Sequence, residues 1–318
     1  MDAFAKFMQL AVQLGTPFLL ATLGGICCEK VGNLNLGIEG MMMMGAFCGF
    51  WAALTSGNIF LGVAAAFLGG VLCALIYGFI TITLMGNQTV TGFAMATFGA
   101  GLANFLGRNY SSNILSSEII APIGTKVIPG LSRIPVLGTM LFSQNVLVYA
   151  AILIAVILAV YFGKTNAGLS ARIVGENPAT ADASGIHVVR CKYLHVLLGG
   201  GLCGLGGGYL SMVYVPYWQN DITAGMGWIA VALVIFSGWN PARAIFGCYL
   251  FGILKALAIK YQGITFTLLG LNFSVSSQLM DMMPYILTVA VLVISSITSR
   301  NKAVGPTSVG RAYFREDR

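Results

Sequence analysis

Long apolar runs alternate with short polar or glycine-containing stretches along most of this 318-residue chain. A helix needs about 20 predominantly apolar residues to cross the hydrocarbon core of a bilayer. We place apolar segments at residues 7–28, 36–54, 59–85, 90–106, 145–162, 194–215, 228–238, 244–259 and 282–299. The pattern predicts an all-α fold, a polytopic transmembrane helical bundle of about eight to ten segments. We expect residues 1–299 to form one transmembrane domain and residues 300–318 to form a basic tail.

Composition and charge agree with a membrane class. The chain is 57% hydrophobic and 8% charged, whereas a typical soluble domain is about 25% charged. The formal charge of +7 does not indicate nucleic-acid binding, because the basic residues flank the apolar segments. They are Lys164, Arg172, Arg190 and Lys192 around a central polar insert, and Arg300, Lys302, Arg311, Arg315 and Arg318 in the tail.

Short basic loops beside spans mark the cytoplasmic face of a membrane. We therefore expect the loop at about residues 164–190 and the C-terminal tail to be cytosolic. Alternation then places residues 108–143, 216–227 and 260–281 outside. The N-terminus also falls outside if all nine segments cross, and one re-entrant segment would reverse that end.

Several apolar segments are broken or short. Two Asn, three Gly and one Glu interrupt the apolar sequence between residues 31 and 40. Residues 86–92 (GNQTVTG) form a similar polar, glycine-containing break. Segment 228–238 is too short to cross, and Asn240 is positioned to cap the helix that restarts after it. Irregular backbone at membrane depth is tolerated where it is buried in protein or lines a wet cavity. We therefore expect these stretches to mark a pathway and internal inverted repeats; the alternative is an interfacial loop outside the hydrocarbon.

The broken stretches supply candidates for a pathway through the membrane. Neutral amides and hydroxyls set among aromatic walls suit a polar solute that must pass without tight binding. The candidates are Asn33, Asn35, Asn87, Thr89 and Thr91, with Phe93 and Phe98 as possible ring-stacking walls, although an aromatic residue in a span is more often plain packing. Glu39 is a single charge in apolar surroundings, so we expect it to pair with Lys30 or with backbone amides and brace the broken helix.

The polar insert between Gly168 and Cys191 contains the pattern of a short helix. Asn177 can cap it, Pro178 suits its first turn, and Gly185 suits a left-handed stop. One interpretation is an ordinary cytosolic loop with a solvated helical turn. The other is a rigid element through which a separate cytosolic motor applies force to the membrane domain.

Sequence patterns typical of soluble enzymes occur in this chain but do not indicate an enzyme. The GxGxxG pattern at residues 199–204 has no preceding strand, and Gly200, Gly204 and Gly208 instead predict a small-residue face for close helix packing. Leu158 occupies the place of the first glycine of a phosphate loop, so we expect no ATP site. His187, His195 and the seven cysteines lack metal-site spacing, and no catalytic set is apparent. We therefore expect no metal, no catalytic residue and no enzyme activity in this chain.

Three motifs carry a resemblance to a known family. They are residues 33–47 (NLNLGIEGMMMMGAF), residues 89–92 (TVTG) and residues 172–186 (RIVGENPATADASGI). Together they resemble bacterial ABC-importer permeases of the branch that includes ribose and branched-chain amino-acid permeases. Within that branch, the chain is most similar to nucleoside and simple-sugar importers, above all guanosine-type ones, that use a basic-membrane-protein-type lipoprotein. The likeness extends from about residue 15 to residue 299, and the Gly-Glu-Asn-Pro segment is its most specific part.

The resemblance implies a function and a set of partners. The chain would be a multi-pass permease of the bacterial cytoplasmic membrane that forms half of a path for nucleosides or simple sugars. It would pair with a paralogous permease, a cytosolic ATP-binding subunit and an extracellular substrate-binding lipoprotein. ATP and Mg²⁺ would be bound by the ATPase, and this chain would need no cofactor. The coupling helix that docks into the ATPase would use Arg172, Gly175, Glu176, Asn177, Pro178, Ala179, Ala181 and Gly185.

Two other classes of membrane protein remain open at this point. An ion-coupled secondary transporter of a small polar solute would also explain the broken helices, but it usually needs buried ionisable groups on the path. Glu39 keeps that option open. A channel or structural subunit would not need the polar insert. Dependence of transport on ATP, without a response to ionophores, would favour the importer.

Overall fold

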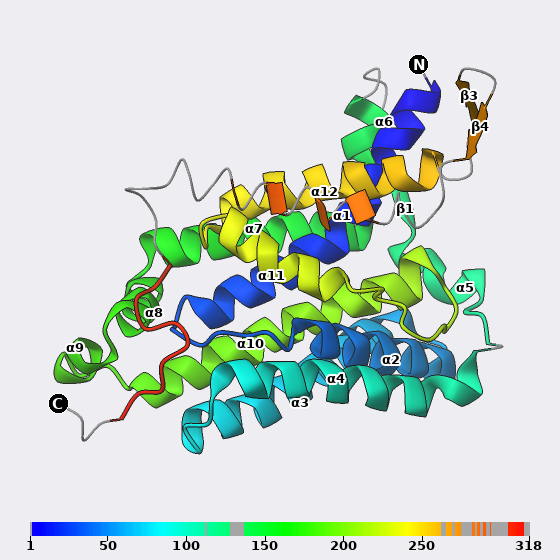
Figure 1. Ribbon diagram of the computed structural model, residues 1–318. Helices are drawn as coiled ribbons and strands as arrows, with labels where there is room; N and C mark the ends of the chain where they lie inside the picture. The colour runs from blue at the N-terminus through cyan, green and yellow to red at the C-terminus, as the bar shows by residue number, and fades with distance from the viewer. Residues whose placement is uncertain are drawn as a thin grey trace.

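The computed structural model describes residues 2–111, 113–127, 137–261, 265–268, 271–274, 282–283, 285–286, 289–290, 293 and 305–314 (Figure 1). Long helices dominate this part of the chain, as the hydropathy pattern predicts. They are α1 (Asp2–Glu29), α2 (Ile38–Ser56), α3 (Ile59–Gly78), α4 (Gln88–Gly107), α7 (Val146–Lys164), α10 (Val188–Tyr209) and α12 (Pro241–Tyr261). Single π-helical turns, Phe79–Thr83 and Leu210–Tyr214, extend α3 and α10.

Shorter elements connect these helices. The short helices are α5 (Ser117–Ile120), α6 (Leu137–Phe142), α8 (Asn166–Glu176), α9 (Pro178–Ala183) and α11 (Met226–Phe236), with 3-10 turns at Arg108–Tyr110 and Ala121–Ile123. Two small antiparallel ladders join β1 (Thr125–Val127) to β2 (Ser143–Asn145) and β3 (Thr265–Leu268) to β4 (Leu271–Ser274). In the first ladder Lys126 lies opposite Gln144.

Seven helices in the described part of the chain are long and apolar enough to cross a membrane. They correspond to seven of the nine predicted segments, and α11 corresponds to an eighth that is too short to cross, as expected. The ninth, residues 282–299, lies largely outside the described residues. The all-α, multi-span fold is therefore confirmed, whereas internal inverted repeats remain a prediction.

Local sequence signals explain where several helices begin. The side chains of Asn58, Asn87 and Asn145 accept hydrogen bonds from backbone amides in the first turns of α3, α4 and α7. The predicted cap at Asn240 is present, because its Oδ1 accepts a bond of 2.9 Å from the amide of Ala242 in α12. Each cap satisfies an amide that has no partner within its own helix.

Helix α10 lies at the centre of the bundle, between α1, α2 and α3 (Figure 1). Its glycines let all three neighbours approach closely. A Cβ atom at Gly199 would lie 2.5 Å from the carbonyl oxygen of Gly24 in α1, and one at Gly207 would meet the carbonyl oxygen of Met42 in α2. Close contact between backbones supplies the packing attraction that the hydrophobic effect does not provide between helices in lipid.

The helices run between two distinct ends of the molecule (Figure 1). Helices α8 and α9 and residues 305–314 lie at one end, together with the end of α1. The start of α1, α5 and β1 lie at the other end (Figure 1). Helix α11 returns the chain toward the α8–α9 end, where the indole nitrogen of Trp239 donates to a carboxylate oxygen of Glu29 over 2.6 Å.

Candidate functional site

Helices α8 and α9 form an arm, residues 166–185, that projects from one end of the bundle (Figure 1). The buried residues of α8, Gly168, Ala171, Val174 and Gly175, fall on one helical face. The side chain of Thr165 caps this helix by accepting from the amide of Gly168 over 3.0 Å. Burial of one face fixes the arm to the bundle and leaves the other face exposed to solvent.

Helix α9 has the start and the stop that the sequence predicts. The Asn177 Oδ1 accepts hydrogen bonds of 3.1 Å from the amides of Ala179 and Thr180, with Pro178 in the first turn. Gly185 follows the helix with φ of +82°, a left-handed conformation that other residues adopt at a cost. Thr180, Ala183 and Gly185 are exposed, whereas Ala181 is buried. The exposed side of α9 is therefore available to a partner.

Gly175 lies where three segments meet. A Cβ atom here would lie 2.2 Å from the carbonyl oxygen of Lys30, the residue after α1. The carbonyl oxygen of Gly175 in turn accepts a hydrogen bond of 3.0 Å from the amide of Ser308. Only glycine allows α8 to approach both the end of α1 and residues 305–314 so closely.

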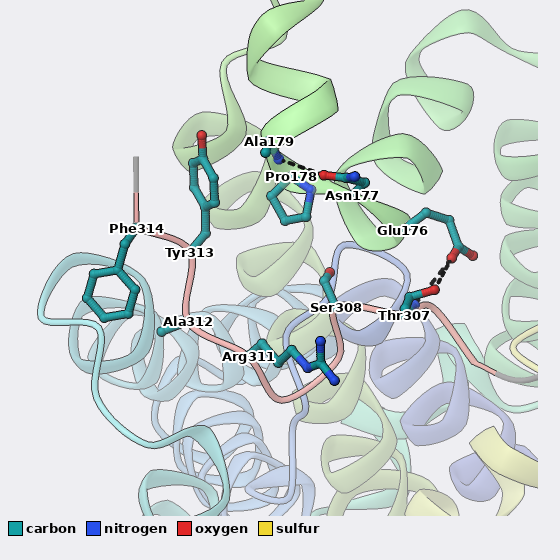
Figure 2. A pocket seen from close by; sticks show the side chains of 10 residues that line it. All are labelled: Glu176, Asn177, Pro178, Ala179, Thr307, Ser308, Arg311, Ala312, Tyr313 and Phe314. Carbon is teal, nitrogen blue, oxygen red and sulfur yellow. Dashed lines mark hydrogen bonds between the residues drawn. The ribbon is translucent and has the colours of Figure 1, made fainter. Parts of the chain in front are cut away.

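Residues 305–314, here called the C-terminal segment, pack on the α8–α9 arm. Sequence analysis missed this contact, because a polar, basic stretch at the chain end gives no periodic signal. A pocket of about 360 Å³ lies between the arm and the segment (Figure 2). Its walls are Glu176, Asn177, Pro178 and Ala179 on one side and Thr307, Ser308, Arg311, Ala312, Tyr313 and Phe314 on the other.

Arg172, another predicted coupling residue, lies apart from that pocket. It lines a smaller cavity of about 180 Å³ with Lys30, Trp239 and Asn240. Burial lowers the pKa of Lys30, the positive charge of Arg172 lowers it further, and Glu176 acts in the opposite direction. Lys30 and Arg172 are the charged residues that line this cavity, which lies next to the root of the arm.

The Glu39 carboxylate binds backbone amides, one of the two expected partners, and not Lys30. Its Oε1 accepts from the Thr223 hydroxyl over 2.5 Å and from the Gly225 amide over 3.0 Å. Its Oε2 accepts from the Gly227 amide over 2.6 Å. These donors lie at or just before the start of α11, where helix amides lack partners and favour an anion. Glu39 therefore joins the start of α2 to the start of α11.

The two asparagines of the first broken stretch are fully buried. Asn33 donates to the Thr81 hydroxyl over 3.4 Å, and the Asn35 Oδ1 accepts from the Gly37 amide over 3.0 Å. Gln88, which sequence analysis did not single out, braces the same stretch. Its Oε1 accepts from the Leu34 amide over 2.7 Å, and its Nε2 donates to the Arg311 carbonyl oxygen over 3.2 Å.

The other predicted path residues lie on or next to α4. Asn87 caps this helix, and the Thr91 side chain is buried against it. Phe98 is exposed. Thr89 and Phe93 are also exposed, and they share one side of the helix with Thr97, Gly101 and Asn104. These five residues, here called the α4 face, form a stripe that includes polar groups on the exposed surface of this span. The structure thus separates the eight predicted path residues into a buried group, an exposed group and the half-buried Glu39.

An aromatic pair stands beside the α4 face. The rings of Phe93 and Trp228, the latter at the start of α11, have centroids 5.5 Å apart and planes tilted by 30°. Both side chains are exposed, at 51% and 37%. Near the far end of α4, the Asn104 side chain donates to the Asp221 carboxylate over 2.9 Å.

Gly200, Gly204 and Gly208 lie against α3. A Cβ atom at Gly204 would lie 2.3 Å from the carbonyl oxygen of Ala66, and one at Gly200 would lie 2.7 Å from the carbonyl oxygen of Gly70. A Cβ atom at Gly208 would lie 2.5 Å from the Ala66 side chain. These three glycines therefore face another helix of the same chain.

Comparisons with known proteins identify the family. Residues 8–292 match the family described as the branched-chain amino acid transport system permease component. A protein of Haloferax volcanii, provisionally named a glucose ABC transporter permease, is 34% identical over 99% of both chains. A guanosine ABC transporter permease of Bacillus subtilis is 35% identical over 87% of both chains, and a nucleoside ABC transporter permease of Lactococcus lactis is 32% identical over 94% of both. The resemblance read from the sequence is thereby confirmed, and this chain belongs to the branched-chain amino acid transport permease family of ABC transporters, as a multi-pass membrane permease.

Proposed function

We propose that this permease is the translocating subunit of an ATP-driven importer for nucleosides or simple sugars. The observation that carries the proposal is the α8–α9 arm. A capped, solvent-exposed helix stands at one end of the bundle and is tied through Gly175 to the end of α1. A movement of α9 would therefore be passed on to the broken stretch that follows α1. An ATP-binding subunit that holds the nucleotide and Mg²⁺ would dock on this arm.

The path itself is proposed to run along the α4 face. Thr89 and Thr97 are exposed polar residues on a membrane span, and the Thr97 hydroxyl donates to the carbonyl oxygen of Phe93 over 3.2 Å. Polar residues on the surface of a span usually face a protein partner or a wet cavity. Because the stripe lies on the surface of this chain, a second subunit is needed to enclose the path. We propose a paralogous permease as that subunit, so that each chain forms half of the path.

The chemistry of this face suits a nucleoside or a sugar. The Thr89 hydroxyl can exchange hydrogen bonds with ribose or hexose hydroxyls, and the Thr97 hydroxyl, which donates to the Phe93 carbonyl oxygen, can still accept one. The exposed ring pair of Phe93 and Trp228 offers a flat surface on which a purine or a sugar ring can stack. The similar proteins from B. subtilis and L. lactis are named for guanosine and nucleosides, and the one from H. volcanii for glucose. We rank nucleosides first because the aromatic pair matches a base.

The remaining partners follow from the direction of transport. An extracellular lipoprotein would deliver the substrate to the end that carries α5 and β1. The α8–α9 end, with the C-terminal segment, would then face the cytosol, in agreement with the basic residues around the insert. The membrane would be the bacterial cytoplasmic membrane.

Uptake by whole cells tests this proposal. Cells with and without the gene are given labelled guanosine, other nucleosides, glucose and leucine, and initial rates are compared. We expect loss of the gene to abolish uptake of a nucleoside, or of a sugar, and to leave leucine uptake unchanged. Unchanged uptake of all nucleosides and sugars would contradict the proposed substrate class.

A further inference from the structure

The C-terminal segment is fastened to the root of the arm by its own hydrogen bonds. The amide of Ser308 donates to the carbonyl oxygen of Gly175 over 3.0 Å. The hydroxyl of Thr307 donates to Oε2 of Glu176 over 2.7 Å, and the Thr307 amide reaches the same oxygen over 3.2 Å (Figure 2). The Ser308 side chain is buried. The segment is therefore a fixed part of this end of the molecule.

Further contacts tie the same segment to α9 and to the start of α4. The Tyr313 hydroxyl donates to Oδ2 of Asp182 in α9 over 3.2 Å. The carbonyl oxygen of Arg311 accepts from the side chain of Gln88 at the start of α4. The segment thus bridges α9 and the start of the helix that carries the α4 face.

The pocket between the arm and the segment is open, and its lining includes charged and aromatic side chains. Its two charged lining residues are Glu176 and Arg311. The Glu176 carboxylate already accepts the bonds from Thr307. The guanidinium of Arg311 has no hydrogen-bond or ion-pair partner among the residues that the structure describes, and Arg311 is exposed. Phe314, at the rim of the pocket, is 46% exposed.

We propose that the C-terminal segment is part of the docking surface for the ATP-binding subunit. This inference rests on the proposed function. Helix α9 and residues 307–314 form the two walls of one socket, and the occupant is an acidic side chain of the ATPase that pairs with Arg311. Three observations favour this occupant: the socket includes the start of α9, its available charge is positive, and its lining combines Arg311 with the rings of Tyr313 and Phe314, residue types that are enriched at protein interfaces.

Site-specific photo-crosslinking tests the proposal in the assembled transporter. Benzoylphenylalanine is placed at Thr180, at Phe314 and, as a control, at Phe60, an exposed aromatic residue at the start of α3. We expect adducts with the ATP-binding subunit at positions 180 and 314 and none at position 60. An adduct at 180 without one at 314 would overturn this inference and leave the proposed function intact. No adduct at either position would overturn the proposed function itself.

A charge-reversal series tests the acidic partner. We expect Arg311→Glu to weaken binding of the ATP-binding subunit to the reconstituted permease by about fivefold at low salt, with a smaller effect at high salt, because the pair lies at a solvent-exposed rim. Arg311→Lys keeps the charge and should bind like the wild type. Equal binding of the ATPase to the Arg311→Glu variant and the wild type would show that Arg311 does not meet an acidic group.

Discussion

The carboxylate of Glu39 accepts a hydrogen bond from the amide of Gly227, with 2.6 Å between Oε2 and N. The two residues are 188 positions apart. Each stands at the start of a helix, α2 in one case and the short helix α11 in the other. The two starts are also pressed together, because a Cβ atom at Gly227 would lie 2.5 Å from the Cα atom of Glu39. The charge of Glu39 thus serves the fold at the junction of two interrupted segments.

Replacing Glu39 by Gln should lower stability more than it changes substrate preference. An amide has one acceptor oxygen, whereas the carboxylate accepts from Thr223, Gly225 and Gly227. We expect the free energy of unfolding to fall by about 2 kcal/mol, the range for hydrogen bonds to a charged group. Thermal unfolding in detergent measures this, with Glu118→Gln, at an exposed site in α5, as the control. A stable variant with altered substrate choice would show that Glu39 contacts the substrate.

Gly185→Val should uncouple transport without removing the protein from the membrane. At φ of +82° a β-branched residue is strained, and the end of α9 would have to shift. Gly185→Asn is the matched control, because asparagine tolerates the left-handed region and a Cβ atom there would have no atom within 4 Å other than those of its chain neighbours. We expect the Val variant to lose most uptake at normal membrane levels, and the Asn variant to keep it. Equal uptake by the two variants would show that transport does not depend on the backbone conformation at the end of α9.

Gly204→Ala should disturb packing of α10 against α3. The new Cβ atom would lie 2.3 Å from the Ala66 carbonyl oxygen, a backbone atom that cannot turn away. Overpacking of this kind costs about 1–3 kcal/mol. Gly101→Ala is the control in another span, because its Cβ atom would have no atom within 4 Å outside its own stretch of helix. Monodisperse yield and melting temperature in detergent should fall for Gly204→Ala alone. If Gly204→Ala kept the yield and melting temperature of the wild type, α10 and α3 would have to lie further apart than the structure shows.

Single cysteines should map the path on α4. In a variant without the native cysteines, Thr89→Cys and Thr97→Cys should react with a membrane-impermeant thiol reagent, because an aqueous path hydrates the thiol. Asn35→Cys should not react, since Asn35 is fully buried. Leu153→Cys, on the apolar surface of α7, is also exposed but should face lipid and stay unreactive. Labelling of position 35 but not of 89 or 97 would place the path elsewhere.

Much of the fold could be read from the sequence, because each relevant signal is local. Apolar runs of the right length correspond to α1, α2, α3, α4, α7, α10 and α12. The caps at Asn177 and Asn240 depend on residues two or three positions away. The small-residue spacing at Gly200, Gly204 and Gly208 marked a close helix contact, although it did not reveal that the neighbour is α3.

Contacts between distant segments could not be read in this way. Glu39 finds its donors more than 180 positions along the chain, and periodicity says nothing about which amides will be free there. Asn33 and Asn35 were grouped with Thr89 because all are polar residues in broken stretches, yet tertiary packing buries the first two and exposes the third. The C-terminal segment has the composition of a solvated tail, and its fixed position depends on Gly175, a residue far away in the sequence.

Reconstitution tests the central claim most directly. The permease, its paralogous partner and the ATP-binding subunit are placed in proteoliposomes with the substrate-bound lipoprotein, and uptake of labelled guanosine is followed. The account predicts uptake that requires ATP inside the vesicles with the ATPase, stops when ATP is replaced by a non-hydrolysable analogue, and is insensitive to ionophores. Uptake that continues without ATP and collapses when an ionophore dissipates the ion gradient would contradict it.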